Sequence, residues 1–356
     1  MEYKQVRIAA DTEGGDPING VPPIERMVAG AVDAVKQDDK LTVVLSGNKQ
    51  DIESFLSKHG YEGRGIEITE RGREKYLFRR LVNMHRKGEV DGVYTAWNTQ
   101  YVTPTITSKS KLGMIVDDLK LPPLVSKMPY FKLIKKDGTS VTDVSDLDFN
   151  DIADLEFGHY FALDLGANRD CSSQNLYEFA VMAKYYVNSM SGKENPRIAL
   201  LNIGGEDKKG NEIDIETYQK LKQSPELNFV GNVEKPILRG DLTDIVVTDG
   251  RTGNVFLKTS EATADFVKIA MKYLIKREAD FFTKIRCSGV PKATKKINEL
   301  TDSATYGGAP ALGIDGHVVK THGTFCKTAA KNGLILTAKY ARANTVQAIK
   351  NELVYS

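Results

Sequence analysis

The stretch 244–261, DIVVTDGRTGNVFLKTSE, combines residue types that bind a small anionic ligand. It opens with an apolar, β-branched run that is typical of a buried strand. The polar residues after that run, Asp249, Gly253 and Asn254, predict a turn, and Lys258 follows in an amphipathic stretch. Ligands of open α/β sheets bind beyond the carboxyl ends of the strands. The stretch therefore predicts backbone N–H groups, an amide and a cation directed at one anion.

Three other segments place amide and charged side chains just after a strand-like run. TAWNTQ supplies Asn98, LDLGAN supplies Asn168, and LLNIGGEDKKGNE supplies Asn202, Glu206 and Lys209. A charged run such as EDKKG is ordinarily a solvated loop when it stands alone. In a doubly wound sheet, however, such strand ends converge on one crevice. Their recurrence therefore favours a shared binding site.

Two glycine-rich segments are compatible with either a structural or a functional role. DTEGGD, which contains Asp11, Gly14 and Gly15, follows the first strand-like run and predicts a tight turn or an anion-binding loop. It does not match the dinucleotide-binding or P-loop patterns. YGGAPALGIDGHVVKTHG ends at His322 and Gly323. The pattern leaves His322 open as a packed structural residue or a catalytic one.

The composition is that of a globular protein rather than of a nucleic-acid-binding or membrane-spanning one. The 356 residues are 41% apolar, and the net charge of +2 gives no field that attracts nucleic acid. No apolar run approaches the roughly 18 residues of a membrane span, and the strand-like N-terminus leaves no room for a signal peptide. The three scattered cysteines lack zinc-ligand spacing and suit a reducing compartment. We therefore expect a cytoplasmic protein without a metal or a cofactor.

Short apolar runs alternate with helical patterns along the chain, which predicts right-handed βαβ units. Strands are predicted over 6–11, 41–47, 91–98, 160–168, 197–204, 228–234 and 244–250. Helices are predicted over 23–37, 49–59, 74–87, 173–190, 213–223 and 258–278. We expect a single α/β domain over 1–356 with a doubly wound, mostly parallel sheet. Residues 132–157, rich in Asp and poor in apolar anchors, predict an inserted arm or lid.

Together the polar segments resemble the phosphate acyltransferase PlsX family. The match is carried, in order between residues 11 and 323, by D-x-x-GGD, NT, LDLGAN-x-D-C, PR-x-ALLNIG-x-E-x-KKG, NF-x-GNVE, D-x-VV-x-DG-x-TGNV-x-LKT, YGGAPALG and VVK-x-HG. The resemblance implies a dimeric α/β/α sandwich of the isocitrate/isopropylmalate dehydrogenase type. It also implies conversion of an acyl thioester on acyl carrier protein, with inorganic phosphate, into acyl phosphate for fatty acid and phospholipid synthesis.

The chain departs from the family pattern beside the expected site. The family usually has SAGNTGA where this chain has TAWNTQY, so Trp97 and Gln100 replace glycines and are expected to narrow an acyl pocket. A short-chain or non-lipid acyl thioester, as used by the related glycine reductase component, is therefore an alternative. A non-catalytic scaffold is a second alternative. A decarboxylating dehydrogenase is a third, although the acidic residues are dispersed rather than clustered for a metal.

The implied reaction, phosphorolysis of a thioester, needs a held phosphate, a stabilised carbonyl oxygen and a thiolate leaving group. By this logic we expect Lys209 and Asn254 near the reacting carbonyl, and His322 as a general base or a supporting donor. No protein nucleophile is required, because phosphate itself attacks. The residues expected to bind phosphate or substrate are Asp11, Gly14, Gly15, Asn98, Asn168, Asn202, Glu206, Asp249, Gly253 and Lys258.

The segment 268–303 is predicted to project as a basic amphipathic element. Within 268–299, nine Lys or Arg residues stand against three Asp or Glu residues. Leu274, Phe281, Phe282 and Ile285 fall on one face of a helix. This face predicts either a homodimer interface or contact with an acidic surface, for which acyl carrier protein and an anionic membrane both qualify.

Overall fold

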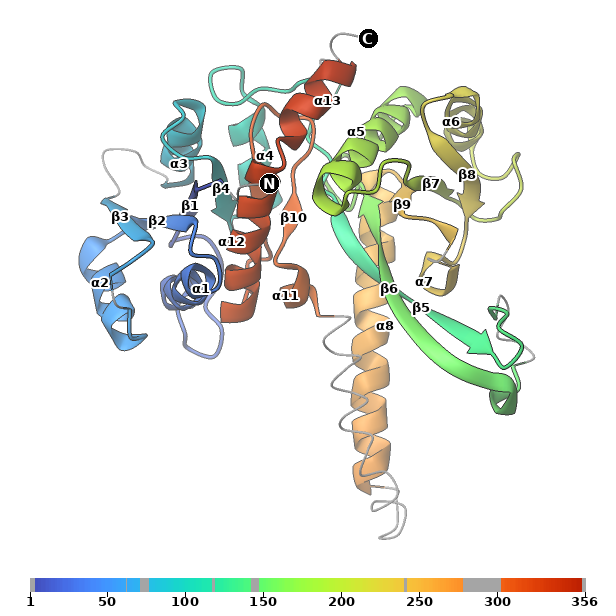
Figure 1. The fold of residues 1–356 in the computed structure, drawn as a ribbon, viewed down its shortest axis with the longest axis horizontal. Helices are drawn as coiled ribbons and strands as arrows, with labels where there is room; N and C mark the ends of the chain where they lie inside the picture. The colour runs from blue at the N-terminus through green and yellow to red at the C-terminus, as the bar shows by residue number, and fades with distance from the viewer. Residues whose placement is uncertain are drawn as a thin grey trace.

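The strands of the protein are divided between two sheets, which form the two lobes of Figure 1. The computed structural model describes residues 4–61, 63–70, 77–116, 119–141, 147–239, 242–277 and 302–353. The first sheet has the order β10-β11-β4-β1-β2-β3 and the second the order β5-β6-β9-β7-β8. The strands of the first sheet are β1 (Val6–Asp11), β2 (Leu41–Gly47), β3 (Ile66–Glu70), β4 (Gly92–Thr95), β10 (Ala309–Pro310) and β11 (Val318–Lys320). Those of the second are β5 (Ser126–Lys135), β6 (Ile152–Leu163), β7 (Arg197–Leu201), β8 (Asn228–Val233) and β9 (Ile245–Val247).

Helices cover both faces of the first sheet. One face packs against α1 (Pro23–Gln37), α2 (Lys49–Lys58) and α12 (Lys327–Arg342), and the other against α3 (Leu77–Arg86) and α4 (Thr99–Thr107). The central strand β1 is buried at five of its six positions. This near-continuous burial matches its apolar sequence, as is usual for a parallel strand covered on both sides.

The second sheet lies between a helical layer and one long helix. One face packs against α5 (Ser173–Ser191), α6 (Glu212–Gln223) lies beside α5, and the opposite face packs against α8 (Gly250–Arg277). The short helices are η1 (Phe149–Asp151), α7 (Pro236–Arg239) and α11 (Ser303–Tyr306), and α13 (Thr345–Leu353) packs on α5. Local sequence fixes α5 at both ends, through a capping box between Ser172 and Asn175 and a left-handed Gly192. One apolar core runs from α1 and α12 to α5, so it joins the two lobes.

The prediction of a mostly parallel α/β fold is confirmed. Only the β5–β6 and β10–β11 pairs are antiparallel among the named strands. What the sequence pattern did not reveal is the division of the parallel strands between two sheets. The carboxyl ends of the two sets of strands consequently contribute loops to one site from two sides rather than along one edge.

Two long elements extend from the second lobe in Figure 1. The antiparallel hairpin β5–β6 is one, and the described residues of the segment 132–157, which the sequence singled out, form its outer part. The helix α8 is the other, and it reaches well beyond the sheet. Of the basic segment 268–303, the structure describes 268–277 and 302–303. The predicted positions Phe281, Phe282 and Ile285 lie outside the described residues.

Candidate active site

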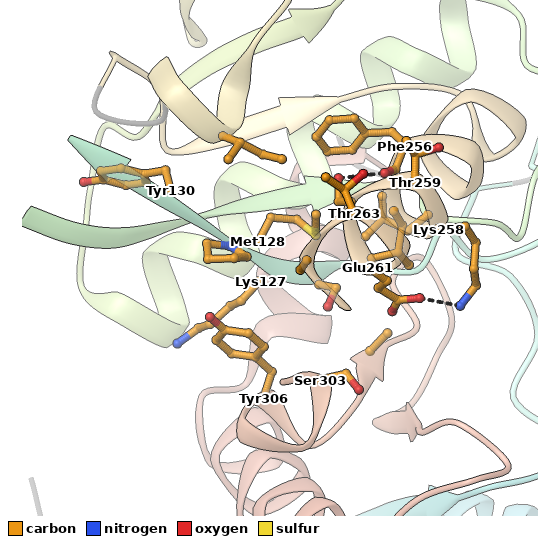
Figure 2. Close-up of a pocket in the computed structure, with 18 of the residues that line it drawn as sticks. Lys127, Met128, Tyr130, Phe256, Lys258, Thr259, Glu261, Thr263, Ser303 and Tyr306 are labelled. Carbon is orange, nitrogen blue, oxygen red and sulfur yellow. Dashed lines mark hydrogen bonds and ion pairs between the residues drawn. The ribbon is translucent and has the colours of Figure 1, made fainter. Parts of the chain in front are cut away.

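A cavity of about 1160 Å³ opens between the lobes and takes its lining from both. Figure 2 shows part of this lining, with Lys258 and Glu261 towards one end and Tyr130 towards the other. The first end is polar, and most of the remaining lining is apolar. The polar end consists of Thr99, Lys320, Thr321 and His322 from the first lobe and Gly166, Asn254, Lys258 and Glu261 from the second. Of the residues predicted from sequence, the structure therefore brings Asn254, Lys258 and His322 together.

Two basic side chains lie beside one carboxylate at the polar end, and the charge of Lys258 acts on a third basic group, Lys320. The Lys258 Nζ lies 2.7 Å from Oε2 of Glu261, and Nε2 of His322 lies 4.0 Å from Oε1 of the same carboxylate. Burial, and secondly the charge of Lys258, lowers the pKa of Lys320. Burial and then Lys258 likewise lower the pKa of His322. A single carboxylate does not balance these basic groups, so this end of the cavity favours an anionic ligand.

The N-terminus of α8 supplies part of this end. Sequence predicted a turn over 249–254, but α8 already begins at Gly250, so Asn254 lies in its first turns. Asp249 precedes the helix and accepts hydrogen bonds from the Thr252 N–H (2.9 Å) and hydroxyl (2.6 Å), as an N-cap residue does. A Cβ on Gly253 would lie 2.0 Å from the Asp164 carbonyl oxygen, so only glycine permits this close packing. The N–H groups of Gly250, Thr252 and Gly253 already donate within the protein, so α8 contributes its Asn254 and Lys258 side chains to this end.

Asp164 organises the loop that faces Asn254. It is fully buried at the end of β6, and Oδ1 accepts hydrogen bonds from the N–H groups of Leu124, Gly166 and Ala167. Its Oδ2 accepts from both the backbone N–H (2.6 Å) and the side-chain amide (3.0 Å) of Asn168. The side-chain amide of Asn168, a residue predicted to bind phosphate, thus donates its hydrogen bond to Asp164. Sequence analysis placed Asp164 in a motif but missed this role, which depends on contacts that only the folded loop makes.

The DTEGGD loop lies outside the cavity and positions the loop that contains His322. Asp11 is fully buried, accepts a hydrogen bond from the Gly14 N–H (2.7 Å), and has a pKa that burial raises to about 6. The loop joins the one that follows His322, because the Asp16 N–H donates to the Gly323 carbonyl at 2.9 Å. Gly15, at φ +107°, packs against the same carbonyl. Asp11, Gly14 and Gly15 do not line the cavity, and their contacts fix the position of the His322 loop.

The loop after β7 lies apart from the cavity lining. Lys209 Nζ is 3.7 Å from Oε1 of Glu206, and the Asn202 amide donates to the Lys209 carbonyl at 3.0 Å. None of these three residues lines the cavity. Their loop does follow β7, the parallel neighbour of β9, so it belongs to the same sheet edge as Asn254. The predicted role of Lys209 near the reacting carbonyl, and those of Asn202 and Glu206 in binding phosphate or substrate, stay predictions.

The loop after β4 contributes Thr99 rather than its bulkier neighbours. Asn98 accepts a hydrogen bond from the Tyr101 N–H at 3.0 Å and caps α4. The Trp97 ring lies 5.3 Å from that of Tyr101 and packs against the apolar cluster beneath α3 and α4. Neither Trp97 nor Gln100 lines the cavity. Their predicted effect on acyl-chain length stays a prediction.

Cys171, inside the LDLGAN-x-D-C motif, lies in surroundings that disfavour the thiolate form a nucleophile needs. Burial first, and then Asp164, raises the pKa of its thiol to about 12, and the thiol donates to the Asn168 carbonyl at 3.6 Å.

Among the residues that the structure describes, no group of three or more His, Cys, Asp or Glu side chains could hold a metal ion. Within the same ranges, no helix has the length and apolarity to cross a membrane.

An apolar groove continues from the polar end between the β5–β6 hairpin and α8. Met128, Tyr130, Leu133 and Phe157 come from the hairpin, Phe256, Leu257, Val267 and Met271 from α8, and Ile237 from α7. The groove was not predicted from the sequence. The strand β5 and the facing surface of α8 each mix apolar with polar residues, so neither sequence pattern alone indicates an apolar binding groove. The arrangement suits a ligand with an anionic or polar head and a long apolar tail.

Comparison with solved structures places this fold among the phosphotransacylases. A phosphotransacetylase from Streptococcus pyogenes aligns with a TM-score of 0.55 at 14% identity, covering 94% of each chain. One from Staphylococcus aureus aligns with a TM-score of 0.54 at 14% identity, covering 96% of each chain. At this identity the likeness establishes the fold alone.

Sequence relatives establish the family. A family model described as a fatty acid synthesis protein matches residues 155–348. A phosphate acyltransferase from Fusobacterium nucleatum is 32% identical over 351 residues, which is 98% of this chain and 99% of that protein. Another from Clostridium tetani is 32% identical over 353 residues, covering 98% of each. The chain belongs to the phosphate acyltransferase (PlsX) family and is an enzyme that transfers acyl groups to phosphate.

Proposed function

We propose that this enzyme forms acyl phosphate from inorganic phosphate and a long-chain acyl thioester carried by acyl carrier protein, for fatty acid and phospholipid synthesis. The observation that carries the proposal is the continuity of one cavity from the basic end at Lys258, Lys320 and His322 into the apolar groove beside α8. Phosphate fits the basic end, and an acyl chain fits the groove. The thioester carbonyl then lies where the two meet.

The reaction is a displacement at the thioester carbonyl. A phosphate oxygen attacks the carbonyl carbon, negative charge develops on the carbonyl oxygen, and the C–S bond then breaks. The thiolate, whose conjugate thiol has a pKa of roughly 8.5, leaves and takes a proton from solvent. Positioning and charge stabilisation are then the main demands on the protein. No covalent acyl-enzyme is required.

Three groups of the polar end have roles in this scheme. Lys258 and Lys320 bind and aim phosphate. The Asn254 amide donates to the developing oxyanion, an interaction worth about 3–4 kcal/mol per donor at an active site. His322, whose pKa is lowered by burial first and then by Lys258, accepts the phosphate proton, and Glu261 holds Lys258 in place.

The length of the groove favours a long-chain donor over the short-chain or non-lipid alternative. Its apolar lining extends along the hairpin as far as Leu133 and along α8 as far as Met271. Each buried CH₂ group contributes about 0.8 kcal/mol, so a groove of this extent distinguishes long chains from acetyl groups. A non-catalytic scaffold would not need the basic end and the groove to be continuous.

The exposed apolar surface of α8 belongs to the same proposal. On this helix Phe266 is 69% exposed, Ile269 67% and Leu274 54%. The surface of the projecting helix is therefore unusually apolar for one that contacts solvent. We assign this surface to a homodimer interface, with peripheral contact to anionic membrane as the alternative. Ile269→Asp with Leu274→Asp should yield monomers in sedimentation. Persistence of the dimer with salt-sensitive loss of vesicle binding would favour the membrane instead.

Phosphate-dependent release of free thiol tests the proposed reaction. Acyl carrier protein and coenzyme A bearing the same palmitoyl group are incubated with the enzyme, with and without phosphate. We expect thiol release only with phosphate, and faster release from the carrier protein. Release without phosphate would indicate a hydrolase, and no release from any donor would support the scaffold alternative.

A further inference from the structure

We propose that Lys127, His159 and Lys339 form a binding site for the phosphate group of the phosphopantetheine arm that carries the acyl thioester. This inference rests on the proposed function and adds a second anion site to it. The three residues come from β5, β6 and α12, so they bring both lobes to one side of the cavity. None of them belongs to the polar end described above.

Lys127 and His159 lie against the same aromatic ring, and Lys339 lies close enough for its charge to act on Lys127. Lys127 pairs with Phe161 across the hairpin, and its Nζ lies 5.5 Å from the centre of the Phe161 ring. The His159 ring packs edge-on against the same ring at 5.7 Å. The charge of Lys339 acts on Lys127, and the charge of Lys127 acts on His159. The Phe161 ring therefore forms the floor of a small basic patch.

The patch carries no compensating acidic group within the described part of the chain. Burial and then Lys339 lower the pKa of Lys127, and no carboxylate counteracts them. Burial and then Lys127 lower the pKa of His159, again without an opposing carboxylate. Like charges that repel one another on a partly buried surface are stabilised when an anion binds between them.

Its position relative to the polar end fits a pantetheine arm. Lys127 lines the same cavity as Lys258. In Figure 2 Lys127 and Tyr306 lie on one side of the cavity, whereas Lys258 and Glu261 lie at its polar end. An extended arm whose sulfur reaches the polar end can therefore place its phosphate at Lys127 while the acyl chain enters the apolar groove. The arm of acyl carrier protein and that of coenzyme A share this phosphate.

Paired substrates isolate the contribution of that phosphate. Palmitoyl-phosphopantetheine and palmitoyl-pantetheine carry the same thioester and differ only in the phosphate. We expect the wild-type enzyme to prefer the phosphorylated arm by about tenfold or more in kcat/KM, which corresponds to one charge-assisted interaction. Lys127→Met and Lys339→Met should each lose most of this preference through KM, and Lys127→Arg should retain it. Lys331→Met, on the same helix α12, is the matched control and should behave as the wild type.

These measurements distinguish an effect on binding of the arm's phosphate from an effect on the acyl-transfer step. Turnover of palmitoyl-pantetheine should be equal in the wild type and the variants. A phosphate preference that survives in Lys127→Met and Lys339→Met, or equal losses with both substrates, would overturn the proposal. Calorimetry with phosphopantetheine and pantetheine tests the site even if no acyl phosphate forms. Comparing palmitoyl-carrier protein with palmitoyl-coenzyme A then identifies which source of the arm benefits from the lysines.

Discussion

Two donor groups of Asn168, its backbone N–H and its side-chain amide, donate to one oxygen of the buried Asp164, at 2.6 and 3.0 Å. The other carboxylate oxygen accepts from three further backbone N–H groups. One side chain therefore fixes the loop against which Asn254 packs, since a Cβ on Gly166 would lie 3.3 Å from the Asn254 Oδ1. The shape of the reaction site thus depends on a residue that does not line it.

Replacing Asp164 by Asn tests this dependence. The new NH₂ group would face N–H donors, so buried donors lose their acceptor at a cost of about 1–3 kcal/mol each. We expect Asp164→Asn to lower the free energy of unfolding by about 3 kcal/mol and to lower turnover at temperatures where the fold persists. Urea denaturation and thiol-release kinetics check both effects. Wild-type stability and turnover would show that the loop holds its shape without the carboxylate.

Loss of Asn254 or Lys209 should impair the reaction without unfolding the protein. Asn254 lies at the polar end of the cavity, and the Lys209 loop follows the neighbouring strand of the same sheet edge. We expect Asn254→Ala and Lys209→Ala each to lower turnover about a hundredfold, as loss of an oxyanion donor does. Lys208→Ala serves as the control in the Lys209 loop. Turnover close to wild type in either variant removes that residue from the chemistry.

The width of the apolar groove should set the preferred chain length. Val267 lines the groove, whereas Ile269 on the same helix does not. We expect Val267→Trp to shift the kcat/KM optimum towards shorter acyl thioesters, because the indole fills space that the chain needs. Ile269→Trp should leave the profile unchanged. Equal profiles for wild type and Val267→Trp would place the acyl chain elsewhere.

Asp11 should make stability depend on pH. Burial raises its pKa from 3.8 to about 6, so between these values the folded protein holds a proton that the unfolded chain releases. Stability due to this group is therefore full below about pH 4 and falls as the pH rises through 6, by about 3 kcal/mol in total. We expect Asp11→Asn to be more stable than the wild type at pH 7 but not at pH 4. Urea denaturation at both pH values measures the difference, and an equal difference at both would assign it to packing.

The sequence correctly predicted those elements whose hydrophobic pattern agrees with the residues that mark their ends. The predicted spans 6–11 and 23–37 coincide with β1 and α1, whose ends are marked by an apolar run before Asp11 and by Pro22 and Pro23. It missed β5, an edge strand that holds a proline and several lysines, and α4, which is rich in threonine and contains Pro104. The helix α12 was also missed. Its central Gly333 packs so closely on Tyr94 that a Cβ would lie 2.2 Å from the ring.

The site was predictable in part for a related reason. Asn254, Lys258 and His322 stood out because each follows a strand within its own motif. Glu261 and Lys320 did not, because a residue inside a helix or in a three-residue strand becomes part of the site only when the two lobes meet. The apolar groove is likewise a property of two facing surfaces. Local sequence patterns contain no information on that contact.

Direct detection of the product tests the central claim. The enzyme is incubated with phosphate and a panel of acyl thioesters from acetyl to stearoyl, on acyl carrier protein and on coenzyme A. Mass spectrometry then measures acyl phosphate. We expect acyl phosphate in amounts equal to the thiol released, with long chains preferred and with formation slowed about a hundredfold in Asn254→Ala. Release of free fatty acid in place of acyl phosphate, or no product from any donor, would contradict it.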